Sequence, residues 1–329
     1  MASIKDVAKR AGVAISTVSK VLNNYPNVSG ETQRKVRTAI EELGFVPNAA
    51  ASMLSSKQAG RIALLINQNR LTQAVDEIDM QYITGAINQA KKLNMDIITL
   101  FFSMIMDMSL EEITGYLRSQ NIVGLVICGM DRESRILQEL IRSKRFKMVV
   151  IDAPFQNETT SSIGIDHEKA QYDVARKTAL ENDCKSILYI SGTKSSYVME
   201  KRLAGLKRLT GEHEMKLLVK CGDFSERKAR ELAMKYARNK DMIVCASDLM
   251  AIGAMNALIE MDIFRPVCGF DGITLMGYVG RQMNTVRQNF SYIASEAVKE
   301  LTILLSGGIG RERILDYELV RMKYEDIIC

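Results

Sequence analysis

The sequence predicts a small α-helical module followed by a larger α/β core with two parallel sheets. Apolar residues recur at helical spacing in three short segments before residue 44. From Arg61 onward, continuous apolar runs alternate with helical patterns. Uninterrupted apolar strands separated by helices are typical of parallel sheets that are covered on both faces. A chain of 329 residues is long enough for two or three domains of this kind.

The first segment, Ser3 to Asn23, predicts two short helices joined by a tight turn. Apolar positions 4, 7, 8 and 11 define the first helix, which Ser3 and Asp6 begin as a capping box. Gly12 lies where a helix end needs a positive φ. Apolar positions 15, 18, 21 and 22 define the second helix, and its other face carries Ser16, Thr17, Ser19 and Lys20.

Hydroxyls and a cation on an exposed helix face suit phosphate oxygens and base edges. The segment therefore predicts a helix-turn-helix whose second helix enters the major groove of DNA. Two amphipathic helices of an ordinary small bundle are the alternative interpretation.

A third helix is expected from Ser29 to Leu43, with Ser29 as its cap. Pro47-Asn48 then breaks the chain, and the residues up to 57 offer only Met53 and Leu54 for packing. So short a segment is marginal as an isolated helix in water. It is either a flexible linker or a hinge that becomes helical when two copies meet on DNA. In the second case Leu54 is an apolar wedge between minor-groove base steps.

Charge is distributed unevenly along the chain. The net charge is +5, and residues 1–57 hold eight Lys and Arg against four Asp and Glu, a local charge of +4. A basic module joined to a near-neutral body is the pattern of a nucleic-acid reader with a separate sensor. The six cysteines form no CxxC pair, so we expect reduced, buried thiols and neither a metal site nor a disulfide framework. We expect no cofactor. Without a long apolar run or a secretory signal, we expect a cytoplasmic protein that does not enter the membrane.

Eight apolar runs predict buried strands, and a ninth lies near 318–323. The eight cover 61–66, 95–101, 122–128, 147–152, 186–191, 217–221, 242–246 and 266–270. Helical patterns between them include 81–92, 168–181, 226–235 and 249–260. Ligand sites of open α/β sheets lie beyond the carboxyl ends of the strands. The residues found there are Asn67, Asp152, Ser191, Ser247, Asp248 and Asp271.

Several longer motifs occur in order: IKDVAKRAGVAISTVSKVLNN, VSGETQRKV, EELGFVPNAAASML, RLAGL, ASDLMAIGAM and GFDG. Their order and spacing resemble the lactose-repressor (LacI/GalR) family of bacterial transcription regulators over the full chain. The resemblance implies a helix-turn-helix headpiece at 1–46, a hinge helix at 47–60 and a periplasmic-binding-protein-like core at 61–329. Within the core it implies two subdomains. The N-subdomain would hold about 61–160 plus about 288–315, and the C-subdomain about 161–287 plus about 316–329.

The resemblance also implies roles for individual residues. Ile15, Ser16 and Lys20 match base-reading positions of the recognition helix. The full set of implied DNA contacts is Ser3, Ile4, Ile15, Ser16, Thr17, Ser19, Lys20, Asn23, Ser29, Thr32, Asn48, Ala51 and Leu54. The implied effector contacts are Asn67, Asp152, Arg202, Phe224, Ser247, Asp271 and Phe290.

The effector set has the chemistry of a polyol pocket. Carboxylates accept hydrogen bonds from hydroxyls, an arginine fork donates to two oxygens at once, and an aromatic ring covers an apolar sugar face. Convergent polar groups around an apolar cleft are the usual mark of a ligand site. An Asp that caps a helix at a strand end and a Phe that belongs to the core are the alternatives for single members.

The sequence also departs from the family pattern at several places. Ala14 stands where serine is usual, which removes a helix cap worth about 1 kcal/mol. Lys20 replaces the usual arginine, so a point charge takes the place of a bidentate fork. Ser247 replaces a usual asparagine, and Gly272 replaces the second aspartate of the GFDD pattern.

The expected function is a sequence-specific transcriptional regulator, a repressor that binds near-palindromic double-stranded operator DNA. We expect a homodimer, with a tetramer left open, whose operator affinity depends on a carbohydrate-like effector between the core subdomains. The alternatives are a small-molecule receptor with a vestigial headpiece, and a regulator controlled by a nucleobase-type ligand or a protein co-regulator. We expect no enzyme, because the chain has only His167 and His213 and lacks GxSxG and Walker A patterns.

Overall fold

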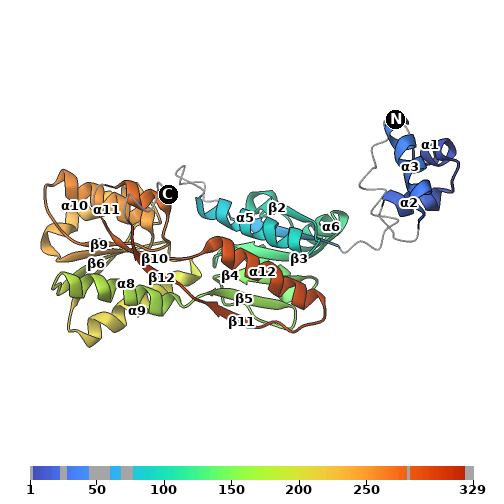
Figure 1. Cartoon of the computed structure of the whole chain (residues 1–329). Helices are drawn as coiled ribbons and strands as arrows, with labels where there is room; N and C mark the ends of the chain where they lie inside the picture. The colour runs from blue at the N-terminus through green and yellow to red at the C-terminus, as the bar shows by residue number, and fades with distance from the viewer. Residues whose placement is uncertain (1–2, 23–27, 44–59, 68–76, 280–281, 323–329) are drawn as a thin grey trace. The chain divides into compact units, whose positions relative to one another are not determined.

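The computed structural model describes residues 3–22, 28–43, 60–67, 77–279 and 282–322 (Figure 1). The chain divides into two compact units, Met1–Ala59 and Gly60–Cys329. Most of the expected hinge at 47–60 lies outside the described residues, so the boundaries of headpiece and hinge remain predictions. In the described ranges, no helix is long and apolar enough to cross a membrane.

The first unit consists of three helices, α1 (Ile4–Ala11), α2 (Ile15–Leu22) and α3 (Gly30–Leu43). This agrees with the three helices that the periodicity predicts. Their described core is small and contains Val7, Ala8, Val18, Val21, Val36 and Ala39. A three-helix unit with so small a core is close to the lower limit for independent folding.

The predicted ends of these helices are confirmed. The Ser3 Oγ accepts a hydrogen bond from the Asp6 N–H at 3.3 Å, and the Ser3 N–H donates to the Asp6 carboxylate at 2.8 Å, which completes the capping box. Gly12 adopts φ +65°, the left-handed conformation that ends α1. At the start of α3, the Ser29 Oγ accepts from the Thr32 N–H at 3.4 Å.

The second unit is built on two six-stranded sheets. Its described strands are β1 (Arg61–Ile66), β2 (Ile97–Phe101), β3 (Ile122–Cys128), β4 (Lys147–Ile151), β5 (Thr160–Ile165), β6 (Ser186–Ser191), β7 (Lys216–Cys221), β8 (Met242–Cys245), β9 (Val267–Cys268), β10 (Asn284–Arg287), β11 (Glu312–Leu315) and β12 (Glu318–Arg321). The first sheet has the order β11-β5-β4-β3-β1-β2, and all its pairs are parallel. The second has the order β12-β10-β9-β8-β6-β7, and only β12 is antiparallel.

Helices cover these sheets. They are α5 (Glu77–Lys92), α6 (Leu110–Ser119), α7 (Arg135–Ser143), α8 (His167–Glu181), α9 (Tyr197–Glu212), α10 (Glu226–Tyr236), α11 (Asp248–Glu260) and α12 (Phe290–Leu305). Short 3-10 turns are η1 (Phe102–Met104), η2 (Ala237–Asn239) and η3 (Thr274–Tyr278). Helix α12 packs against α5, β3, β4 and β5, whereas the pairs α8–α9 and α10–α11 belong to the second sheet (Figure 1).

Strand β1 shows why the apolar runs are continuous. Ile62, Leu64 and Ile66 are buried in one hydrophobic cluster, and the alternate residues Ala63 and Leu65 are buried in a second cluster. Successive side chains of a strand point to opposite faces, so both faces of the first sheet are covered. The α/β prediction is confirmed by this arrangement.

Each predicted apolar run contains a strand, but the pattern misses β5, β10 and β11. β5 reads TSSIGI, and its polar residues Thr160, Ser161 and Ser162 are buried. Short polar side chains do not form an apolar run, so periodicity alone does not reveal them. The pattern misses β10 (NTVR) and the edge strand β11 (ERIL) for a similar reason, because both are short and contain polar or charged residues.

Strand β5 also corrects the expected division of the core. It belongs to the first sheet, whereas a division at about residue 160 assigns it to the second subdomain. The chain therefore crosses between the sheets after β5, after β10 and after β11. His167 follows the first crossing, and Gln288 lies at the second. Both residues reappear in the polar network that joins the subdomains.

Candidate functional site

One face of α2 presents the predicted base-reading side chains. Ile15 is 46% exposed, and Ser16 and Lys20 are also exposed. On the opposite face, Val18 and Val21 are buried in the headpiece core. Packing therefore holds the helix in place while its polar face remains open to a partner. An exposed apolar side chain such as Ile15 can contact a thymine methyl group in the major groove.

The other predicted DNA contacts have varied surroundings. Ser3 and Ser29 are exposed, and their hydroxyls cap α1 and α3, whose first backbone N–H groups suit phosphate oxygens. The half-buried members are Ile4, Thr17, Ser19 and Thr32. Four predicted contacts lie outside the described residues, namely Asn23, Asn48, Ala51 and Leu54.

Ala14 occupies the position before α2 where a cap is expected. Its carbonyl accepts from the N–H groups of Thr17 and Val18 at 2.9 and 3.2 Å. Because alanine has no side-chain oxygen, it cannot bond a first-turn amide as serine would. The recognition helix therefore starts without the side-chain cap that the family pattern supplies.

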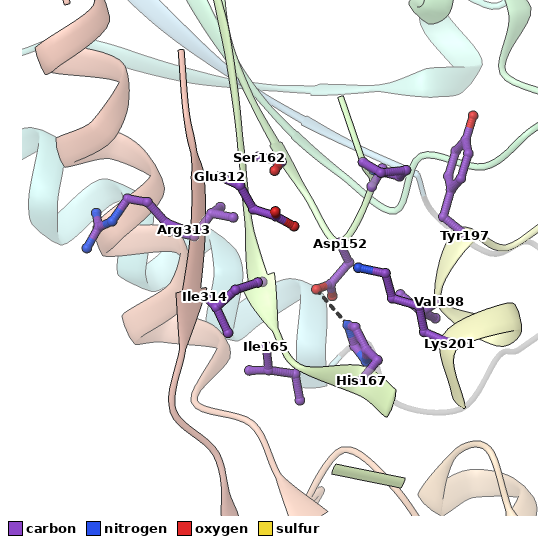
Figure 2. A pocket seen from close by; sticks show the side chains of 14 residues that line it. Asp152, Ser162, Ile165, His167, Tyr197, Val198, Lys201, Glu312, Arg313 and Ile314 are labelled. Atoms are coloured by element: carbon purple, nitrogen blue, oxygen red, sulfur yellow. Dashed lines mark hydrogen bonds and ion pairs between the residues drawn. The ribbon is translucent and has the colours of Figure 1, made fainter. Parts of the chain in front are cut away.

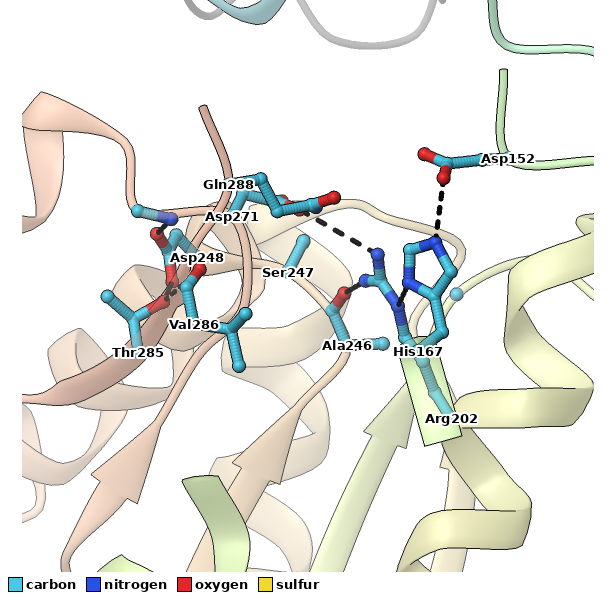
Figure 3. A network of polar contacts seen from close by, with 12 residues as sticks. Asp152, His167, Arg202, Ala246, Ser247, Asp248, Asp271, Thr285, Val286 and Gln288 are labelled. Carbon is cyan, nitrogen blue, oxygen red and sulfur yellow. Dashed lines mark hydrogen bonds and ion pairs between the residues drawn. The ribbon is translucent and has the colours of Figure 1, made fainter. Parts of the chain in front are cut away.

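In the core, Arg202 is the centre of a polar network (Figure 3). Its side chain comes from α9 and is buried, with only 4% of the residue exposed. Nε donates to His167 Nδ1 at 3.4 Å, and Nη1 donates to the Ala246 carbonyl. Nη2 lies 3.9 Å from the Asp271 carboxylate. The guanidinium also lies 3.5 Å from the ring centroid of Phe270, a close cation–π contact.

His167 connects this network to the first sheet. Its Nε2 lies 2.9 Å from the Asp152 carboxylate at the end of β4, while its Nδ1 accepts from Arg202. The two partners require the neutral tautomer with the proton on Nε2. Burial lowers the pKa of His167 although Asp152 opposes the shift, so the ring is neutral near pH 7. Asp152 and Arg202 are therefore linked through one imidazole.

Asp271 closes the other side of the network. Gln288 Nε2 donates to its Oδ1 at 3.2 Å. Burial raises the pKa of Asp271; Arg202 opposes this rise and the charge of Asp248 adds to it. Asp248 is itself buried. It accepts hydrogen bonds from the Thr285 hydroxyl at 2.6 Å and from the backbone N–H groups of Gly272 and Ile273.

Ser247 and Phe224 lie in the same subdomain as Arg202, in local contacts of their own. The Ser247 Oγ accepts from the Met250 N–H at 3.3 Å and caps α11. Phe224 has φ +57° and its ring lies directly against Gly192, since a Cβ there would come within 2.1 Å of the ring. The position of this aromatic ring therefore depends on a glycine.

Asn67 and Phe290 are the remaining predicted effector contacts. Asn67 follows β1 and donates from Nδ2 to the Gly129 carbonyl at 3.0 Å. Phe290 is 4% exposed and packs edge-on against Tyr82, with 5.3 Å between ring centroids. Among the contacts of the described residues, neither side chain bonds to the Arg202 network. Phe290 is thus part of the core between α5 and α12.

A small pocket lies beside Asp152, between β4, β5, β11 and the start of α9 (Figure 2). His167, Tyr197 and Lys201 line it, and the amino group of Lys201 points toward Asp152. Sequence reasoning assigned none of these three to the effector site. The only signal for His167 is its position next to Asp166 in a chain with two histidines.

Two further contacts hold the subdomains together. Glu77, at the start of α5, accepts from the Thr274 backbone N–H at 3.0 Å and from its hydroxyl at 2.8 Å. Arg132 donates to Glu200 at 2.7 Å and lies over the Tyr197 ring at 5.0 Å. The network of Arg202 therefore lies in a core whose subdomains also contact each other through surface residues.

Acidic, histidine and cysteine side chains are the usual protein ligands of metal ions. In the part of the chain that the structure describes, no group of three such residues is arranged to hold a metal ion. The described cysteines are free thiols, four of them buried and Cys221 half-buried, while Cys329 lies outside the described residues.

Two family models match the chain. The model of bacterial regulatory proteins of the lacI family matches residues 3–48. The model of periplasmic binding proteins and the sugar binding domain of the LacI family matches residues 80–266, more than half of the chain.

Relatives match over nearly the full length. The HTH-type transcriptional regulator MalR of Clostridium butyricum is 28% identical and covers 97% of both chains. The HTH-type transcriptional repressor PurR of Aliivibrio fischeri strain MJ11 is 27% identical and covers 99% of this chain and 95% of the relative.

Among solved structures, the Lac repressor dimer bound to operator and the anti-inducer ONPF has a TM-score of 0.81 at 23% identity, with 98% of both chains covered. The transcriptional regulator CelR in complex with cellobiose has a TM-score of 0.71 at 22% identity, with 98% and 100% covered. At these identities the solved structures show a shared fold.

Proposed function

The chain belongs to the LacI family of bacterial regulatory proteins and is a ligand-controlled transcriptional regulator, not an enzyme; we propose that it is a cytoplasmic repressor whose effector binds at the Arg202 network. In this proposal α2 reads operator bases in the major groove. The effector is a small carbohydrate-like molecule bound between the core subdomains.

The observation that carries the DNA-binding half of the proposal is the division of α2 into two faces. Val18 is buried, while Ser16 and Lys20 are exposed on a unit with a net positive charge. Short hydroxyls and a cation on a helix that packing holds in place suit base edges and phosphates. We further propose that two copies bind a near-palindromic operator, with one α2 in each half-site. Lac repressor, a protein of this fold, is described as a dimer bound to operator.

The network of Arg202 supports the effector half. Asp152 belongs to the first subdomain, whereas Arg202 and Asp271 belong to the second, and His167 connects them. A ligand that contacts groups on both sides would favour one arrangement of the subdomains over another. By thermodynamic linkage, operator and effector must change each other's affinity by the same factor. Cellobiose, bound by CelR, is an example of a carbohydrate ligand in this fold.

We would test the DNA-binding half by selecting bound fragments from genomic DNA. Affinity for the selected sites should fall steeply, on the order of 10³-fold, between about 50 mM and about 200 mM salt, because phosphate contacts release counterions. Lys20→Ala should weaken binding and reduce this salt dependence. The exposed core variant Lys207→Ala serves as control and should match the wild type. If no sequence is enriched and both variants behave alike, the headpiece is vestigial.

The effector half has its own test, a thermal-shift screen against sugars, polyols and nucleobases. A ligand that binds only the folded state must raise the unfolding midpoint. Arg202→Ala should remove the response to a compound that shifts the wild type while operator binding remains. A variant that still responds normally would exclude Arg202 from the site.

A further inference from the structure

Most hydrogen-bond donors of the Arg202 network are already used inside the protein. Arg202 Nε and Nη1 donate to His167 and to the Ala246 carbonyl, whereas Nη2 lies 3.9 Å from the Asp271 carboxylate, an ion pair longer than a hydrogen bond. The single N–H of the neutral His167 ring points to Asp152. Arg202 is also only 4% exposed, so its charge interacts mainly with these partners. A ligand would thus find few donors here.

Acceptors, in contrast, remain. Gln288 is only 4% exposed, and its Oε1 has no hydrogen-bond partner among the described residues. Its Nε2 is held by the Oδ1 of Asp271, which fixes the orientation of the amide. The contacts described for Asp271 and Asp152 each involve Oδ1, so Oδ2 of Asp152 is left as an acceptor, and Oδ2 of Asp271 becomes one when that carboxyl is ionised. A buried acceptor without a donor destabilises the folded protein, so Gln288 points to a ligand that supplies one.

Carboxyl groups outnumber cations in this region, since Asp152, Asp248 and Asp271 stand against Arg202 and Lys201. The charges of Asp152, Asp271 and Asp79 all contribute to raising the pKa of the buried Tyr82 hydroxyl, after burial itself. The carboxylates of both subdomains therefore act on one residue of α5. Lys201 lines the pocket next to Asp152, but neither Asp271 nor Gln288 lines that pocket.

We propose that the effector carries a protonated nitrogen that binds against the Asp271 and Gln288 side chains, and is thus a small hydroxylated amine such as an amino sugar. This inference rests on the proposed effector site and narrows its ligand class. Hydroxyl groups satisfy single acceptors, whereas an ammonium group donates to several acceptors and neutralises the excess of carboxylates. A phosphorylated sugar carries negative charge, so these carboxylates would repel it.

Binding of such a cation should release a proton from Asp271. Burial raises the pKa of this carboxyl, and an adjacent cation favours its ionised form. The groups that face it are Arg202 from α9, Asp248 from α11, Asp152 from β4 and Gln288 after β10. Affinity for an amine should therefore rise with pH until Asp271 is ionised in the free protein or the amine itself loses its proton, so net proton release is expected only below the pKa of the amine. A neutral sugar has no such reason to prefer high pH.

The experiment is isothermal titration calorimetry of the full chain with two matched pairs, D-glucose with D-glucosamine and D-galactose with D-galactosamine, plus D-glucose 6-phosphate. We expect the amine to bind at least about tenfold more tightly than its parent sugar in one pair or both, since charge-assisted bonds exceed neutral ones by that much. Repeating the titration in buffers of different ionisation heat should reveal the released proton. If neither amine binds, if the parent sugars bind equally well, or if the phosphate binds best, the proposal is wrong.

Asp271→Asn provides the second arm. The amide keeps the shape and tolerates φ +123° as well as aspartate does, but it cannot be ionised. The variant should lose the preference for the amine and the proton release. Asp183→Asn is the matched control, because it makes the same change at an exposed position with φ +56°, and should behave as wild type. Retention of the amine preference in Asp271→Asn would overturn the assignment, and if that variant does not fold, the wild-type proton release still decides.

Operator binding is measured on the same samples. If selected DNA is bound but the amine preference is absent, only the ligand assignment fails. If no DNA sequence is enriched, the proposed function fails, whatever the calorimetry shows.

Discussion

The headpiece exposes the residues proposed to contact DNA, whereas the core buries the residues proposed to respond to the effector. On α2 the residues proposed to work, Ser16 and Lys20, are exposed, and the residues that hold them in place are buried. In the core, Arg202 and His167 are themselves buried, at 4% and 2% exposure. Changes on the α2 surface should therefore alter binding without altering stability. In the core, binding and stability should change together, because the same buried charges determine both.

The headpiece half of this comparison is tested most strongly by Val36→Ala. Val36 is fully buried, and truncation of a core side chain costs about 2–3 kcal/mol, most of what so small a unit has. The headpiece should unfold and operator affinity should fall at least 100-fold, about 2.7 kcal/mol. Calorimetry should show the core transition unchanged. Thr38→Ala, exposed on the same helix, is the control. Equal losses in both variants would contradict the role of burial.

Asp271→Asn tests the core half, with an intermediate expected effect. A carboxyl whose folded-state pKa is raised above 3.8 loses stability as pH rises from that value through the folded pKa. The ligand-free variant should therefore be more stable than wild type near pH 8 by about 1–2 kcal/mol, with little difference near pH 4. Thermal midpoints of both proteins across this range check the sign. A wild type that gains stability relative to the variant with rising pH would contradict the buried charge.

The smallest expected effect comes from Ala14→Ser. A serine at this position can bond a first-turn amide of α2 and should stabilise the headpiece by about 0.5–1 kcal/mol. The same hydroxyl adds one donor at the DNA surface, so operator affinity should rise a few-fold. Calorimetry of the headpiece transition and operator titration check the two effects separately. No change in either would mean that the backbone alone forms an adequate start for α2.

The sequence predicted most where structure depends on neighbours along the chain. The capping box of Ser3 and Asp6 and the left-handed Gly12 follow from spacing within one helix turn, and both are confirmed. Continuous apolar runs such as β1 were recognisable for a similar reason, since both faces of the strand are buried. Asp152, Arg202 and Asp271 were predicted as effector contacts from the family motifs, and the structure places all three in one network.

What the sequence determined by itself was therefore local: helix starts and stops, apolar strands, the charge of the headpiece and the family motifs. Tertiary structure alone decided that polar β5 is a buried strand, because its serines and threonine are covered by neighbours distant in sequence. It alone placed His167 between Asp152 and Arg202, and left Gln288 with an unpaired buried oxygen. Hydrogen bonds across 15 to 44 residues and the exclusion of water arise only when separate segments pack together, and no local pattern encodes them.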